Sequence, residues 1–264
     1  MAEALAAEGA HVALLSRDAE KLQVVADGIN ATATGRAVIV TADLADHAGL
    51  LTAVDTAEGL LGGPIEILLN NTGGPPQSGV AGLDPELWRA QFESMVLSVF
   101  RLTDRVLPAM RAAGWGRILN VASSSAVEPN PMLGVSNTLR AGITGWAKSL
   151  ATEVAADGVT VNTLLPGRID TPRIQQLDKA TAERTGVTPE QAQSKSVESI
   201  PVGRLGDPAE FGAVAAFLAS PKAAYVTGSL VRIDGGAIRA IQLRSMAEGV
   251  VRGCSPPKPM RRAP

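Results

Sequence analysis

The sequence contains little cysteine and no long apolar run. Cys254 is the single cysteine among 264 residues, so the chain can form neither a disulfide framework nor a cysteine-rich metal site. No apolar run reaches the roughly 18 residues that a membrane span requires, and the N-terminus lacks a basic region followed by an apolar core. These absences predict a cytoplasmic protein without a metal site that is neither secreted nor inserted into a membrane.

Charge of one sign is also missing. The formal net charge is -2, from 24 Lys and Arg against 26 Asp and Glu, and the two signs are mixed along the chain. No basic stripe is present to neutralise a nucleic-acid backbone, so nucleic acid is not an expected partner. The length and the 45% hydrophobic content are sufficient for one domain with a sizeable core.

Apolar segments alternate with segments of helical spacing along the chain. This alternation predicts an α/β fold in which helices cover both faces of one doubly wound parallel sheet. The expected strands lie in residues 11–17, 35–44, 65–73, 116–124, 158–167 and 229–236, and the expected helices in 20–30, 46–61, 85–113, 135–156 and 208–218.

Five motifs occur in a characteristic order. They are NNTG at 70–73, VTVNTLLPG at 159–167, IPVGRLGDPAEF at 200–211, FLAS at 217–220 and YVTGSLVRIDGG at 225–236. Together they resemble the short-chain dehydrogenase/reductase family, and the resemblance extends from the first residues to about Ile241 as one Rossmann-like domain. The chain is most similar to the family's 3-oxoacyl-acyl-carrier-protein reductase-like members and departs from them at several positions.

One departure is at the N-terminus, where MAEALAAEGAHVALLSR reads as most of a helix followed by a strand. In the family, a first strand and a glycine-rich loop precede this helix, and the loop lets backbone N–H groups approach a pyrophosphate. Neither is present, and the missing strand is central in the family's sheet, so its loss would leave backbone groups unpaired. We therefore expect Met1 to be an internal methionine of a longer protein or a miscalled start.

The resemblance also implies a nucleotide site. Arg17 follows the strand where the family carries either an acid for the ribose hydroxyl or a base for a 2′-phosphate, so NADP(H) is favoured over NAD(H); the alternative is a surface arginine. The positions expected to bind the cofactor are Ser16 and Arg17, Asp43 and Leu44 beside the adenine, Asn70, Thr72 and Gly73 beside the adenosine, and Pro166, Gly167, Ile169 and Thr171 beside the nicotinamide.

The catalytic positions align by their flanking residues and are altered. Ser123 takes the family's serine position, Ser136 its tyrosine position thirteen residues later, and Arg140 its lysine position after four more. Met95 occupies the position of the active-site asparagine. Hydride transfer to a carbonyl requires a positioned acid, and serine is a much weaker acid than a phenol whose pKa a neighbouring cation lowers.

Two interpretations of Ser136 and Arg140 remain open, because their spacing places both on one helix face. They could form an altered active pair in an NADP-dependent oxidoreductase acting on a small carbonyl or alcohol substrate. They could also remain from a site whose catalysis was lost, with Arg140 bridging surface or interface carboxylates, in a scaffold that binds nucleotide or a partner subunit. We favour the altered oxidoreductase.

The remaining segments carry weaker predictions. Residues 172–199 are polar with helical spacing and lie where the family has a mobile substrate lid; the alternative is a solvated helical hairpin. Residues 242–264 are Pro-rich and basic and predict a disordered tail. The resemblance implies a homodimer or homotetramer formed through the helices at 85–113 and 135–156, where Trp88 and Trp146 serve either the interface or the core. Tyr225, the single tyrosine, is expected in the core near the last strand.

Overall fold

The computed structural model describes residues 1–239. Six strands alternate with helices along this part of the chain. The strands are β1 (Val12–Ser16), β2 (Ala37–Thr41), β3 (Ile67–Asn70), β4 (Gly116–Val121), β5 (Val159–Pro166) and β6 (Leu230–Ile233). The α-helices are α1 (Ala2–Ala7), α2 (Ala19–Thr32), α3 (His47–Leu61), α4 (Pro85–Phe92), α5 (Ser98–Ala113), α6 (Gly134–Val154), α7 (Pro172–Thr185), α8 (Pro189–Val197) and α9 (Pro208–Ala219). Short helical segments are η1 (Glu93–Leu97), η2 (Ser124–Ala126), η3 (Ala155–Asp157) and η4 (Pro221–Ala223).

All strand pairs are parallel, but the strands form two sheets. One sheet contains β1 and β2, and the other has the order β3-β4-β5-β6. Within the second sheet, Leu119 is in register with Leu69 on one side and with Asn162 on the other. Among residues 1–239, no ladder joins β1 to β3.

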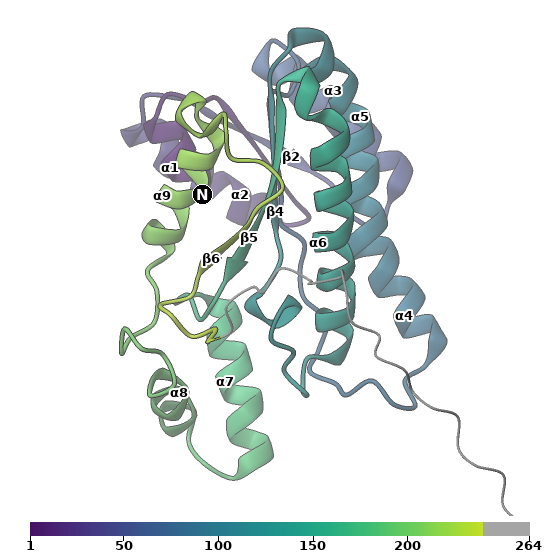
Figure 1. Cartoon of the computed structure of the whole chain (residues 1–264). Coiled ribbons are helices and arrows are strands. Elements are labelled where there is room, and N and C mark those ends of the chain that lie inside the picture. Colours follow the sequence, from purple (N-terminus) through teal and green to yellow (C-terminus); the bar gives the residue numbers. More distant parts are fainter. Residues whose placement is uncertain (240–264) are drawn as a thin grey trace, which may run out of the picture.

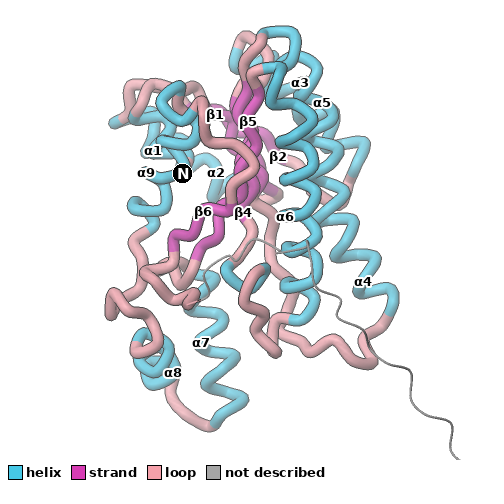
Figure 2. Tube along the Cα trace, in the orientation of Figure 1, coloured by secondary structure: helices cyan, strands magenta, loops and turns pink. Residues whose placement is uncertain are grey.

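Helices cover both faces of these sheets (Figure 1). On one face, α1 and α9 pack through Leu5, Phe211 and Ala215, and α1 also packs on α2 through Ala6 and Ala26. On the other face, α3, α5 and α6 share one apolar cluster with β4 and β5. The tube view shows α7 and α8 beyond the carboxyl ends of the strands (Figure 2). The carboxyl edge is therefore where side chains of several strands can meet.

Sequence signals set the ends of several helices. The carboxylates of Asp18 and Asp46 accept hydrogen bonds from the first turns of α2 and α3, and Asp207 does the same for α9 within a capping box. At the other end of α5, Gly114 adopts a φ of 66°, a left-handed conformation that favours glycine. These local signals explain why the predicted helix positions are close to the observed ones.

The predicted α/β fold with parallel strands and helices on both faces is confirmed. The described strands form two sheets in place of the one sheet that the alternation predicts, because no ladder joins β1 to β3. The expected helix at 85–113 contains a π-helical segment, η1, between α4 and α5. The prediction for Tyr225 is wrong, because its side chain is fully exposed, with a relative accessibility of 101%. It follows η4 in a turn, and the core beside the last strand is formed by Val226 and Val231 instead.

Two predicted segments are the tail at 242–264 and the polar helical segment at 172–199. The predicted tail at 242–264 lies outside the described residues. Residues 172–199 form α7 and α8, a pair of helices with a short connection, and their role as a lid stays a prediction. In the part of the chain that the structure describes, none of the helices is long and apolar enough to cross a membrane.

Candidate active site at the carboxyl edge of the sheet

Ser123 lies directly beyond the carboxyl end of β4. It caps η2, and its Oγ accepts hydrogen bonds from the Ser125 N–H at 3.2 Å and from the Ser125 hydroxyl at 3.0 Å. A serine hydroxyl has two acceptor lone pairs and one donor proton. The Ser125 N–H occupies one lone pair of Ser123, and when the Ser125 hydroxyl is the donor between the two hydroxyls, the Ser123 proton can be donated to another group.

Ser136 lies in the first turn of α6, which packs against η2. Its residue is buried at 7% exposure, and within residues 1–239 its hydroxyl has no hydrogen-bond partner. Met95 of η1, which is 2% exposed, packs with Val135 and Leu139 of α6. The π-helical segment that carries Met95 is a type of distortion often found at functional sites.

Arg140, one helical turn after Ser136, is held by main-chain oxygens. Its Nη1 donates to the carbonyl of Val121 at 2.7 Å, and its Nη2 donates to the carbonyls of Thr72 at 3.3 Å and Gly73 at 3.1 Å. These bonds connect α6 to the ends of β4 and β3. Burial, and secondly the positive charge of Arg173, lowers the pKa of Arg140 to about 10, so the guanidinium remains charged at neutral pH.

One of the two interpretations assigned surface or interface carboxylates to Arg140. The surface part is wrong for the described residues, and the interface part stays a prediction. Over residues 1–239 no carboxylate forms an ion pair with it, and its partners are three carbonyl oxygens. The physical reason is position: a residue at 8% exposure between two strand ends meets main-chain groups that lack other donors. Buried carbonyls need such partners.

The predicted adenosine-side residues divide between two sheets. Arg17, after β1, and Asp43, after β2, form an ion pair at 3.7 Å in which their side chains are 79% and 46% exposed. Ser16 accepts a hydrogen bond from the Asp18 N–H, and Leu44 is half-buried. An exposed pair of this kind contributes little to stability, so Arg17 can exchange Asp43 for another anion.

The NNTG segment contains buried polar groups without partners. The Asn70 Nδ2 donates to the Asn120 Oδ1 at 2.9 Å across the β3–β4 ladder. Among the described residues, the Asn70 Oδ1 and the Thr72 Oγ1 have no hydrogen-bond partner. Buried polar atoms are normally paired, so these two atoms are available to a ligand or to water, beside the exposed Gly73.

The predicted nicotinamide-side residues follow β5. Pro166 ends that strand, and the Gly167 N–H donates to the carbonyl of Ile233 at 2.9 Å. A side chain at Gly167 would lie 2.6 Å from the Cα of Asp234, so only glycine fits there. Ile169 is buried and forms a bridge with Gly206, and the Thr171 hydroxyl donates to the carbonyl of Ile169.

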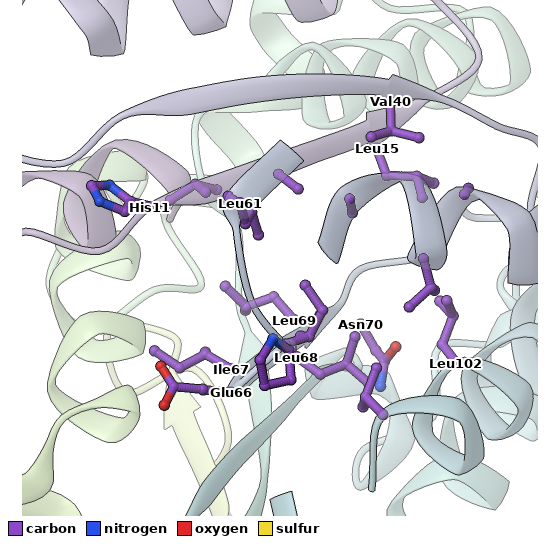
Figure 3. A pocket seen from close by; sticks show the side chains of 18 of the residues that line it. His11, Leu15, Val40, Leu61, Glu66, Ile67, Leu68, Leu69, Asn70 and Leu102 are labelled. Atoms are coloured by element: carbon purple, nitrogen blue, oxygen red, sulfur yellow. The ribbon is translucent and has the colours of Figure 1, made fainter. Parts of the chain in front are cut away.

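A cavity of about 730 Å³ lies between the predicted cofactor residues that follow β1 and β2 and those that follow β3. Its walls come from β1 and β3 and from the helices beside them, and three predicted cofactor residues, Leu44, Asn70 and Thr72, line it. Figure 3 shows Leu15 on one side of the cavity and Leu68 and Leu69 on the other. The site is therefore open between the adenosine-side residues that follow β1 and β2 and those that follow β3.

Three further residues belong to the site but were not predicted. Ser125 orients Ser123, Asn120 pairs with Asn70, and Arg173 of α7 donates to the carbonyl of Pro75 at 2.8 Å. The serine cluster and the polar residue in the apolar strand GRILNV were usable signals for the first two. No signal in the sequence marks Arg173, because its contact joins segments 98 residues apart.

In residues 1–239 there is no group of three or more His, Cys, Asp and Glu side chains that could hold a metal ion. The Nε2 of His47, which lies at the start of α3, contacts a carboxylate oxygen of Glu93.

Comparisons with known proteins identify the family. A family model described as enoyl-(acyl carrier protein) reductase matches residues 1–237. The 3-oxoacyl-(acyl-carrier-protein) reductase FabG of Vibrio cholerae is 34% identical over 236 residues, covering 89% of this chain and 90% of that protein. The D-beta-hydroxybutyrate dehydrogenase of Cupriavidus necator is 34% identical over 242 residues, covering 89% and 91%.

Solved structures give the same assignment. The L-sorbose reductase of Gluconobacter frateurii, determined with NADPH and L-sorbose, superimposes with a TM-score of 0.85 at 31% identity and covers 91% of each chain. An actinorhodin polyketide ketoreductase determined with NADPH gives a TM-score of 0.82 at 30% identity, covering 89% of this chain and 90% of that one. The chain belongs to the short-chain dehydrogenase/reductase family of oxidoreductases.

Proposed function

We propose that the protein is an NADP-dependent oxidoreductase that reduces a small carbonyl compound or oxidises the corresponding alcohol. The observation that carries this proposal is the hydrogen bonding of Ser123. The Ser125 N–H and hydroxyl hold its Oγ in place, and with the Ser125 hydroxyl as the donor between the two hydroxyls, the Ser123 proton is available at the carboxyl edge of the sheet. A fixed donor at this position polarises a carbonyl and stabilises the charge that develops on its oxygen.

The residues present offer contacts for the adenosine and nicotinamide halves of a phosphorylated nicotinamide dinucleotide, whereas the glycine-rich loop for its pyrophosphate is not in the given sequence. The exposed Arg17 supplies a cation for the 2′-phosphate, as expected at the end of the second strand of this fold. The unpaired Thr72 Oγ1 and Asn70 Oδ1 offer polar contacts to the adenosine half, and residues 166–171 lie where the nicotinamide half is expected. When bound, the cofactor supplies the hydride.

Proton supply distinguishes this site from a phenol-based one. The Ser136 hydroxyl is a weak acid, so we assign it the role of relaying a proton from water to the substrate oxygen rather than donating it alone. Arg140 cannot take part in this transfer, because its pKa of about 10 keeps it charged at neutral pH. It positions the ends of β3 and β4 instead, and its charge favours an anionic substrate oxygen.

A specific observation favours a second candidate, a non-catalytic scaffold. Two of the nitrogen atoms of Arg140 are already bonded to main-chain carbonyls, and Met95 is an apolar core residue. Arg140 therefore holds the ends of two strands and Met95 packs in the core, and neither residue transfers a proton. A chain with this pattern could bind nucleotide or a partner subunit without turnover.

The test begins with calorimetric titration of NADPH into the 264-residue protein. A substrate panel follows, containing a 3-oxoacyl thioester, 3-hydroxybutyrate and a ketose, which are compounds related to those named for the similar proteins. The oxidoreductase requires turnover that falls roughly 100-fold or more in Ser123→Ala, the range for one transition-state donor. Ser124→Ala, on the neighbouring serine, is the matched control and should retain activity.

The results of the titration and the substrate panel distinguish the oxidoreductase from the scaffold. Turnover that Ser123→Ala does not change would contradict the assigned role of Ser123. Saturable NADPH binding without turnover of any panel member would favour the scaffold. In that case Ser136→Tyr combined with Arg140→Lys should introduce activity, because it restores a phenol beside a cation four residues away.

We also propose that the protein assembles as a homodimer or homotetramer through the helices at 85–113 and 135–156. Trp146 is packed within the subunit, with its ring centroid 4.6 Å from that of Phe100, and Trp88 packs beside Met95. These contacts explain both tryptophans without an interface. Sedimentation velocity tests the proposal, and a monomer at micromolar concentration would contradict it.

A further inference from the structure

Two arginines from different helices bond to the loop that follows β3. Arg140 of α6 donates to the carbonyls of Thr72 and Gly73. Arg173, in the first turn of α7, donates through its Nη2 to the carbonyl of Pro75 at 2.8 Å. This contact fastens α7, which lies beyond the carboxyl ends of the strands (Figure 2), to the edge that carries the candidate site.

Neither arginine has a carboxylate partner in the part of the chain that the structure describes. Asp178, the buried carboxylate of α7, pairs with Arg168 instead. Burial, and secondly the charge of Arg173, lowers the pKa of Arg140 to about 10, so the two cations are close enough to repel each other. Buried charges are normally paired, and two neighbouring cations without a protein carboxylate favour an anionic ligand.

Arg173 has donors left for such an anion. A guanidinium carries five N–H groups, and within residues 1–239 the Arg173 side chain makes one hydrogen bond, to Pro75. Gly73 and Gly74 beside it are exposed, so the surface next to the two cations is open. The planar fork of a guanidinium matches a carboxylate through two parallel hydrogen bonds.

The first turn of α7 adds to the positive potential. Its N-cap residue, Thr171, makes no side-chain capping bond, because its hydroxyl donates to the carbonyl of Ile169 at 3.2 Å. The N-terminus of a helix carries a partial positive charge that favours an anion close to it. The Arg173 side chain leaves the helix from this same turn, so the dipole and the guanidinium act together.

The position of the two cations relates them to the substrate. The Nη1 of Arg140 donates to the carbonyl of Val121, two residues before Ser123, whose hydroxyl polarises the carbonyl in the proposed function. An anion held by Arg140 and Arg173 therefore lies on the same edge as the oxygen that Ser123 polarises. The 2′-phosphate of the cofactor is expected elsewhere, at Arg17 after β1.

We propose that Arg173 binds a carboxylate of the substrate, and that the protein acts on an oxo acid or the corresponding hydroxy acid rather than on a neutral carbonyl compound. The inference rests on the proposed oxidoreductase function. Arg140 contributes its charge while it keeps its bonds to the main-chain carbonyls. Arg173 supplies the hydrogen bonds, and so selects and orients the substrate while the carbonyl group is left to Ser123.

Pairs of an oxo acid and its neutral methyl ester test the charge requirement. Pyruvate and 3-oxobutanoate are each compared with their methyl esters, with NADPH as the reductant. We expect kcat/KM for the preferred acid to exceed that for its ester by roughly tenfold or more, because hydrogen bonds between charged groups are the stronger ones. The acid-to-ester ratio is measured within each protein, so a general loss of stability affects both compounds alike.

Three variants identify the residue that recognises the carboxylate. Arg173→Met should remove the preference for the acid and leave the ester almost unaffected. Arg173→Lys should retain part of the preference, because it keeps the charge but loses the planar fork. Arg184→Met, at an exposed position of the same helix, makes the same change in charge and should keep the preference.

Two binding measurements need no turnover. Oxamate, a carboxylate beside a carbonyl group, is titrated into the 264-residue protein by calorimetry, with methyl oxamate as the neutral control. We expect saturable binding of oxamate that Arg173→Met weakens roughly tenfold or more, and no binding of the ester. NADPH should bind Arg173→Met as tightly as it binds the unaltered protein.

Three results would overturn the proposal. One is equal use of acid and ester by the unaltered protein, which would leave the proposed oxidoreductase function standing. Another is weaker NADPH binding by Arg173→Met with the acid preference retained, which would assign Arg173 to the pyrophosphate of the cofactor. The third is oxamate binding that is absent or that Arg173→Met does not change. If no compound is turned over, the proposed function is contradicted, and the oxamate titration still decides whether Arg173 binds a carboxylate.

Discussion

Replacing Arg140 by methionine separates its connecting role from any role toward a ligand. Methionine has a similar length and fills the buried space, but it cannot donate to the carbonyls of Val121, Thr72 and Gly73. The change therefore leaves three carbonyls near the ends of β3 and β4 without their donor. We expect the protein to be destabilised and these two strand ends to loosen.

The magnitude follows from two opposing effects. A hydrogen bond to a charged group contributes about 1.5–3 kcal/mol, so three of them contribute about 5–9 kcal/mol before burial of the charge is considered. Burial lowers the pKa of Arg140 from 12.5 to about 10, and at 1.36 kcal/mol per tenfold change this disfavours the charged form by about 3 kcal/mol. The difference predicts a loss of about 4 kcal/mol on replacement.

Urea unfolding followed by circular dichroism measures this loss. With an m-value of about 2–3 kcal/mol/M, the midpoint should fall by about 1.5 M at unchanged slope. Arg89→Met is the matched control, because the Arg89 side chain is 68% exposed and its replacement should change stability by no more than about 0.5 kcal/mol.

A midpoint shift for Arg140→Met equal to that of Arg89→Met would refute the reasoning. It would mean that water or other donors satisfy the three carbonyls when the guanidinium is absent. Arg140 would then be free to serve a bound ligand, and its contacts with the strand ends would be incidental to stability.

Three further predictions concern other parts of the molecule. Arg17→Glu should weaken NADPH binding by roughly tenfold or more but change NADH binding little, because the extra phosphate loses its cation; an equal loss for both nucleotides in calorimetry would contradict this. The pKa of Glu210 is lowered from 4.5 to about 2, chiefly by its hydrogen bond to Arg204. Because this pKa in the folded protein lies below the value in the unfolded chain, the contribution of Glu210 to stability is present above pH 4.5 and is lost as the pH falls toward 2. Acid titration of unfolding should therefore be shallower in Glu210→Gln across that window, and identical profiles would count against the assignment. Gly167→Ala should destabilise the protein by about 1–3 kcal/mol, because the added Cβ meets the Asp234 main chain. Gly142→Ala, on an open face of α6, should stabilise the protein by up to about 1 kcal/mol in thermal unfolding. Similar shifts for both variants would contradict the steric argument.

Local features of the sequence were sufficient for most of the fold. The apolar runs that became β4 and β5 are continuous because both faces are covered, and this pattern is visible in the residues themselves. Helix starts were equally visible, since Asp46 and Asp207 are residues that cap a first turn. The alignment of Ser123, Ser136 and Arg140 also required only their spacing along the chain, although their roles stay predictions.

Contacts between distant segments could not be predicted in this way. One of the two interpretations had Arg140 bridging surface or interface carboxylates, but within the described residues its partners are carbonyls 19, 67 and 68 residues away. The π-helical segment around Met95 depends on how α4 and α5 pack, and the spacing of apolar residues does not distinguish it from a regular helix. The exposure of Tyr225 likewise depends on which side of a turn faces the core.

The sequence by itself determined the order of the elements, the parallel direction of the strands and the edge at which the candidate site lies, because periodicity and turn residues act over a few positions. Only the tertiary structure decided that β1 and β3 stand apart with a cavity of about 730 Å³ between them and that the guanidinium of Arg140 connects two strand ends. The physical reason is that hydrogen bonds and burial between segments far apart in the chain depend on where each segment packs. No short stretch of sequence carries that information.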